Sequence, residues 1–167
     1  MSVSLREHES PDGTELIYSS DEDGTDDLFR KRSDGSGGAE QLTHHDFPIY
    51  VSDWSPDSRY VIVLYGGPQN EEEGWFGGAD LAYLDLQSDE GLKPFLSTRF
   101  GESEPTFSPD GRWVAYQSNE SGQAEIYVRP FPAAEGRWQI SDEGGGYAPG
   151  LPTGHSSSID PRTASWA

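Results

Sequence analysis

The sequence predicts an all-β protein built from about three repeated, four-stranded antiparallel units. Its 167 residues include 20 Gly and 12 Pro, both of which are costly inside helices. No window shows the sustained i, i+3, i+4 apolar spacing of an amphipathic helix. A Ser-Pro-Asp turn followed by an apolar run occurs three times, at residues 10–12, 55–57 and 108–110. Together these observations indicate one repeated unit that stacks on its own copies.

The Ser-Pro-Asp turn predicts the first hairpin of each unit. Proline presets φ at the first corner, aspartate bonds its own backbone, and glycine accepts a positive φ at the next position. The first and third turns end in Gly13 and Gly111, whereas the second ends in Ser58. We therefore expect a slightly less relaxed turn at Ser58. The apolar strands that follow the turns are expected at residues 16–18, 61–65 and 113–116.

Each unit then continues with two further strands. A polar turn that contains glycine leads to an acidic residue and a second apolar run, at residues 27–29, 80–83 and 125–128. A short last strand is expected at residues 40–43, 93–97 and 137–141. The strand before the Ser-Pro-Asp turn is visible at residues 49–54 and 104–107. In the first unit His8 and Glu9 occupy its last positions, so we expect a poor strand there or none.

The alternation of side chains indicates how the units pack. In residues 60–65 both alternating sets are apolar, so neither face of this strand is expected to meet water. Sheets covered on both faces and repeated at a spacing of roughly 40 to 50 residues are typical of β-propeller blades. We predict a partial β-propeller over residues 1–146, with blades at about residues 5–46, 47–101 and 102–146. Residues 147–167 are expected to form an irregular C-terminal tail.

Two stretches carry a resemblance to a known family. "DWSPDSRYVIVLYGG" and "FSPDGRWVAYQSNESGQAEIYVRPFPAAEGRWQIS" resemble the Pro-Asp repeats of TolB-like β-propellers, and are similar to the propellers attached to bacterial serine/threonine kinases. The resemblance covers about residues 10–145. It implies a ring of six or more blades that binds proteins or gates another domain, in the cytoplasm or the periplasm. Related repeats form the gating propeller of prolyl-oligopeptidase-type peptidases, but no kinase or peptidase motif accompanies the blades here.

Three blades do not close a ring, so two blade faces would stay uncovered. Self-association of two three-blade halves is the simplest closed arrangement, and we expect a homodimer or a larger homo-oligomer. The tail breaks the repeat, and one hypothesis is that it is the out-of-frame remnant of a fourth blade. Its "GHSSS" segment, with His155 and Ser156, lacks the last glycine and the preceding strand of a nucleophile elbow. We therefore do not expect a serine hydrolase there.

Charge and composition exclude several kinds of partner. The chain has 30 acidic and 11 basic residues, a formal net charge of −19. Such a surface repels nucleic acid and anionic lipid, and favours solubility or cationic partners. Cysteine does not occur, which excludes disulfides, thiolate metal sites and cysteine nucleophiles. No stretch has the length and apolarity of a signal peptide or a membrane span, so we expect a soluble protein whose compartment stays open.

Two functions are compatible with these features. The first is a non-catalytic binding module with a protein or peptide partner, for which the best candidate is the loop that contains Glu72, Glu73, Trp75 and Phe76. The acidic segment at residues 21–27 resembles the front of a calcium loop. It lacks the distal glutamate, so an acidic surface turn is the preferred interpretation.

The alternative is a metal-dependent hydrolase of esters or phosphoesters at the axial opening of the assembled propeller. Imidazole and carboxylate groups suit a divalent metal such as calcium or zinc, whose bound water could act as the nucleophile. The candidate ligands lie in the loops before the inner strands: His44, His45, Asp46 and Glu102. Asp53 and Glu104 are the candidate catalytic residues. The adjacency of His44 and His45 gives no support, because neighbours on an extended strand point in opposite directions.

Overall fold

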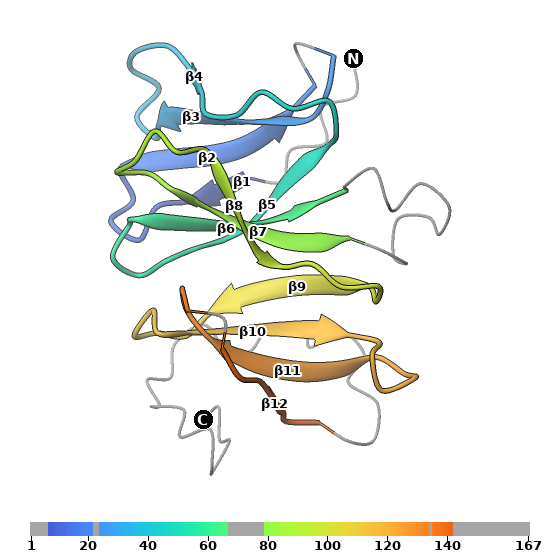
Figure 1. The fold of residues 1–167 in the computed structure, drawn as a ribbon. Coiled ribbons are helices and arrows are strands. Elements are labelled where there is room, and N and C mark those ends of the chain that lie inside the picture. Colours follow the sequence, from blue (N-terminus) through green and yellow to red (C-terminus); the bar gives the residue numbers. More distant parts are fainter. Residues whose placement is uncertain (1–6, 22–23, 67–78, 134, 142–167) are drawn as a thin grey trace.

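A computed structural model describes residues 7–21, 24–66, 79–133 and 135–141, and every regular element in these residues is a β-strand. The strands form three four-stranded antiparallel sheets in chain order, here called blades 1, 2 and 3. Figure 1 shows blade 2 between the other two. The predicted all-β, three-blade arrangement is therefore confirmed. The predicted blade boundaries and the tail at residues 147–167 stay predictions, and the tail lies outside the described residues.

The strands of each blade follow one another without a crossover. Blade 1 contains β1 (Glu7–Glu9), β2 (Glu15–Ser20), β3 (Asp27–Arg32) and β4 (Glu40–Gln41). Blade 2 contains β5 (Ile49–Trp54), β6 (Tyr60–Tyr65), β7 (Asp80–Asp85) and β8 (Leu92–Leu96). Blade 3 contains β9 (Glu102–Phe107), β10 (Trp113–Ser118), β11 (Glu125–Pro130) and β12 (Trp138–Gln139). The poor inner strand expected in blade 1 is the three-residue β1.

The Ser-Pro-Asp turns have the predicted hairpin geometry. In blade 3, Ser108 Oγ donates a hydrogen bond to Asp110 Oδ1 at 2.6 Å and accepts one from the N–H of Trp113 at 3.0 Å. The glycine that follows in this turn, Gly111, has a φ of 68°. Ser58 takes the same left-handed conformation in blade 2 with a φ of 59°. Because its side chain is strained there, the expectation of a less relaxed turn is confirmed.

The acidic residue that opens the third strand of each blade holds the blade together. Asp27 Oδ1 accepts a hydrogen bond of 2.8 Å from Thr43 Oγ1, after β4. Asp80 Oδ2 accepts one of 2.9 Å from Ser97 Oγ, after β8. Glu125 in blade 3 is bonded in the same way by the hydroxyl of a serine that follows β12. These buried carboxylates therefore fasten the end of the outermost strand to its neighbour.

Two cores lie between the blades. Blade 2 is apolar on both faces, as its sequence predicts. Val61 and Val63 pack with Ile17 and Leu28 of blade 1, whereas Ile62 packs with residues of blade 3. We call these two interfaces joint 1–2 and joint 2–3. The inner strand β5 contacts β1 across joint 1–2 and β9 across joint 2–3.

Candidate functional site

Joint 2–3 holds buried carboxylates, packed aromatic rings and a groove, and is the candidate site of the described chain. Asp53, on β5, reaches across the joint to β9. Its Oδ2 accepts hydrogen bonds from Thr106 Oγ1 at 2.8 Å and from the N–H of Phe107 at 2.7 Å. Its Oδ1 accepts one from the N–H of Trp54 at 2.8 Å. With both oxygens bonded, this predicted catalytic residue acts in the structure as a clasp between two inner strands.

An aromatic side chain closes the outer part of the same joint. Phe131 follows β11, and its ring centroid lies 5.0 Å from those of Tyr60 and Tyr83 in blade 2. It lies 4.9 Å from the ring centroid of Phe107, in an edge-to-face arrangement. Such contacts add to the stabilisation from burial. We call Phe131 the plug of joint 2–3.

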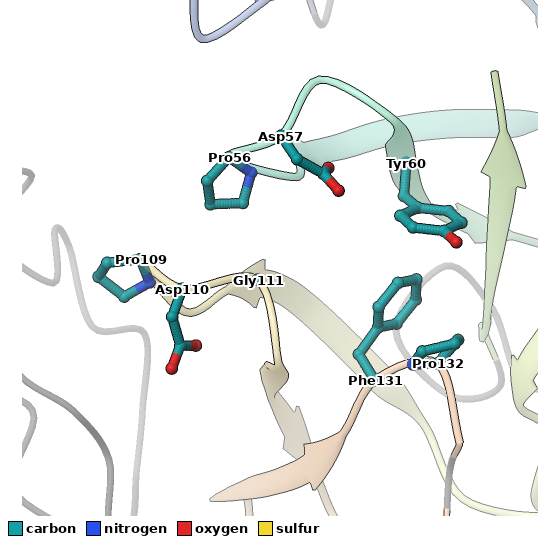
Figure 2. A pocket seen from close by; sticks show the side chains of 8 residues that line it. All are labelled: Pro56, Asp57, Tyr60, Pro109, Asp110, Gly111, Phe131 and Pro132. Atoms are coloured by element: carbon teal, nitrogen blue, oxygen red, sulfur yellow. The ribbon is translucent and has the colours of Figure 1, made fainter. Parts of the chain in front are cut away.

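A groove of about 310 Å³ lies beside the plug. Figure 2 shows it between the Ser-Pro-Asp turns of blades 2 and 3, with Tyr60 and Phe131 at one end. Asp57 Oδ1 is held by the hydroxyl of Ser55 at 2.6 Å, and Asp110 Oδ2 pairs with Arg112 at 2.7 Å. Both carboxylates thus stabilise their own turns. No local sequence pattern predicts this groove, because its two turns are far apart in the chain.

Glu102 is the most unusual ionisable residue of the joint. It opens β9, is 2% exposed, and receives a hydrogen bond of 2.6 Å from Thr98 Oγ1 at its Oε1. Its Oε2 is buried without a hydrogen-bond partner. Burial raises the pKa of Glu102 to about 7, and the negative charges of Asp80 and Glu120 act in the same direction. Burial also raises the pKa of Asp80.

The predicted metal ligands are dispersed. His44, His45 and Asp46 lie in the loop between β4 and β5. The ring of His45 stacks on Phe47 with centroids 4.8 Å apart, and the backbone N–H of His45 donates to the carboxylate of Asp27.

The described residues contain no group of three or more His, Asp or Glu placed to hold a metal ion. Glu104 is exposed, with a φ of 50°. Asp53 and Glu102 both belong to joint 2–3, but each is bound into the packing there. The predicted binding residues Glu72, Glu73, Trp75 and Phe76 lie outside the described residues. The described residues also include no helix long and apolar enough to cross a membrane.

Comparison with known proteins places this geometry among propellers. No protein-family model matches the chain. An uncharacterized protein of Agrobacterium fabrum is 30% identical over 93 residues, which cover 55% of this chain and 28% of that protein. The Tol-Pal system protein TolB of Hydrogenovibrio crunogenus is 32% identical over 74 residues, 44% of this chain and 15% of that protein. The chain thus spans less than a third of the length of these relatives.

Solved structures agree with the sequence comparison. A putative TolB from Agrobacterium tumefaciens superposes with a TM-score of 0.69 at 25% identity, over 81% of this chain and 45% of that one. TolB from Acinetobacter baumannii superposes with a TM-score of 0.65 at 18% identity, over 83% of this chain and 32% of that one. Because the described residues form three antiparallel four-stranded sheets, the predicted resemblance is confirmed: these residues form three blades of a TolB-like β-propeller.

Proposed function

We propose that this chain is a non-catalytic protein-binding module, and that the face of blade 3 turned away from blade 2 is its interaction surface. The likeness to a Tol-Pal system protein supports a role in a protein assembly. The roles of the described carboxylates also support it, because Asp27, Asp53 and Asp80 each accept hydrogen bonds that hold strands or blades together.

One observation carries the proposal. Val114 and Tyr116 of β10 pack into joint 2–3, so the residues between and beside them point to the opposite face. That face holds Trp113 and Trp138, whose ring centroids are 5.5 Å apart, together with Ile126 on β11. Blade 3 is the last sheet of the described stack (Figure 1), so no described blade packs on this face. Apolar faces of this kind are typical of interaction surfaces.

A second copy of the chain is the partner that we propose for this face. Two copies would bring blade 3 of each against blade 1 of the other and close the ring by symmetry. The new joint would be poorer in apolar contacts than joint 2–3. Strand register shows that Glu9 takes the position in β1 that Trp54 has in β5 and Phe107 has in β9. Unlike those two buried rings, Glu9 is exposed. We therefore expect weak, concentration-dependent association.

Solution mass tests this proposal directly. We expect light scattering to show a mass that rises with protein concentration for the unmodified chain and stays monomeric for Trp138→Glu. The matched control is Gln87→Glu, which adds the same charge on an exposed turn of blade 2, away from both faces of the proposed joint, and should leave association unchanged. Circular dichroism checks that both variants are folded. A monomer at every concentration would show that self-association is wrong, whereas a Trp138→Glu variant that still associates would remove blade 3 as the surface.

The metal-dependent hydrolase stays a prediction that no observation favours. Its proposed ligands do not come together among the described residues. Chelator-sensitive turnover of an ester or phosphoester by the purified chain would overturn the non-catalytic assignment. If the background hydrolysis is the same with and without zinc or calcium, that result would support the non-catalytic assignment.

A further inference from the structure

Joint 2–3 contains three acidic residues whose carboxylate groups are only partly satisfied by hydrogen bonds. We call Asp80, Glu102 and Glu120 the buried acidic cluster. Each has one carboxylate oxygen that is buried without a hydrogen-bond partner: Asp80 Oδ1, Glu102 Oε2 and Glu120 Oε1. The three residues come from different segments, namely the start of β7, the start of β9 and the turn after β10. A buried carboxylate oxygen without a partner is costly when it is charged.

The groups that act on Glu102 are hydroxyls and negative charges. Glu102 Oε1 accepts from Thr98 Oγ1 at 2.6 Å and, more weakly, from Ser118 Oγ at 3.5 Å. The negative charges that act on it are those of Asp80 and Glu120. Glu120 is paired through its other oxygen with Arg137.

The remaining ionisable neighbours act on Asp80 and on Tyr116. The Tyr65 hydroxyl bonds Asp80. The charges of Arg129, Arg137, Glu120 and Glu102 all act on the buried Tyr116.

We propose that Glu102 is a proton-binding site that controls how tightly blade 3 packs on blade 2. When Glu102 carries its proton, the cluster holds one negative charge fewer and the buried Oε2 needs no charge compensation. When the proton leaves, Glu102 adds a charge beside Asp80 and Glu120 in a place that water does not reach. Repulsion between like charges and the cost of desolvation then both oppose the closed joint.

The pH range follows from the raised pKa of Glu102. Glutamate has an ordinary pKa of 4.5 and this one lies at about 7 in the fold. Between these values the folded chain binds more protons than the unfolded chain, so stability falls as pH rises. The stability that the protonated Glu102 contributes to the fold is fully present below the ordinary pKa of 4.5, and it is lost as the pH rises through the raised pKa of about 7. We therefore expect the joint to be tightest in mildly acidic solution and looser above neutral pH.

Glu102→Gln tests the proposal, because glutamine keeps the shape of the side chain but cannot ionise. We expect the unfolding equilibrium constant of the unmodified chain to rise between pH 5 and pH 8 by up to about a hundredfold more than that of Glu102→Gln. Urea unfolding of the full chain in dilute solution, where copies are apart, measures this. The matched control is Glu104→Gln, an exposed position on the same strand, which should keep the unmodified pH profile.

Hydrogen exchange locates the effect. The N–H groups of Glu102 and Phe107 bridge joint 2–3, to Ala79 O at 3.1 Å and to Asp53 at 2.7 Å. The N–H of Ile49 bridges joint 1–2, to Asp26 O at 2.7 Å. Relative to Ile49, we expect exchange at Phe107 to accelerate above neutral pH in the unmodified chain but not in Glu102→Gln. Equal acceleration at Ile49 would show global unfolding and overturn control of one joint.

Two further outcomes would also overturn the proposal. If calcium ions restored the joint above neutral pH in the unmodified chain but not in Glu102→Gln, the cluster would be a cation site. If Glu102→Gln does not fold, Asp80→Asn serves instead. Removing that neighbouring charge lowers the pKa of Glu102, so the loss of stability should begin at lower pH. A profile that Asp80→Asn leaves unmoved would contradict the proposal.

Discussion

Joint 1–2 and joint 2–3 connect the same kind of blade by different chemistry. In joint 1–2, Ile17 and Leu28 pack on the valines of β5 and β6, and the Tyr50 hydroxyl donates to Asp26 at 2.6 Å. Joint 2–3 instead depends on the aromatic plug Phe131 and on carboxylates at Asp53 and Glu102. The repeat thus specifies the sheet, whereas the contents of each joint vary.

Equivalent positions make the difference explicit. The N–H groups of Ser33, Leu86 and Phe131 each donate to the carbonyl of the residue after the Ser-Pro-Asp hairpin turn, at 3.0, 2.9 and 2.8 Å. Phe131 plugs joint 2–3, and Leu86 packs against the core of joint 1–2. Ser33 is exposed. The blade 1 side of the stack therefore has no plug at this position, although its stacked Tyr18 and Phe29 rings take the places of Tyr116 and Tyr127.

Removing the plug should have the largest effect. Phe131→Ala deletes a buried ring that packs against four others, those of Tyr60, Tyr83, Phe95 and Phe107, so we expect a loss of roughly 3–5 kcal/mol in the free energy of unfolding. Leu86→Ala at the equivalent, partly buried position should cost less. Urea unfolding of both variants gives the comparison. Equal losses would show that the two joints depend on this position alike.

Removing the clasp should have an intermediate effect. Asp53→Ala leaves the N–H of Phe107 without its acceptor, and an unsatisfied buried donor costs about 1–3 kcal/mol. The control is Asp89→Ala, which removes an exposed aspartate of blade 2 and should change stability little. Thermal or urea unfolding measures both. A loss at Asp53 no greater than at Asp89 would mean that water or another group replaces the carboxylate.

The smallest effect is expected at the turns of blades 2 and 3. Ser58→Gly relieves a left-handed φ of 59° and should stabilise the chain by about 1 kcal/mol or less, because glycine also loses more entropy on folding. Gly111→Ser, at a φ of 68°, should destabilise it by a similar amount. Unfolding midpoints of the two variants should therefore shift in opposite directions. Shifts of the same sign would show that the turns are not equivalent.

The hairpins and the stacking of blades could be predicted from the sequence because they depend on neighbouring residues. Ser55 and Asp57 bond each other across two positions, and the apolar alternation of residues 60–65 lies within one strand. The acidic residues that open the third strands were recognised as part of the repeat, but their hydroxyl partners follow a later strand. Only hydrogen bonding between strands shows what these carboxylates do.

The chemistry of the joints was decided by tertiary structure. From the sequence alone, Asp53 is a candidate catalytic residue and Glu102 a candidate metal ligand near the axis, and solvated loop residues without mutual contact are the alternative interpretation. Asp53 meets Thr106 from 53 positions away in the chain, and Glu102 meets Asp80 only because two blades pack together. Turn geometry and strand alternation are properties of contiguous residues. The pKa and the role of a carboxylate depend on what packs against it, which no local pattern contains.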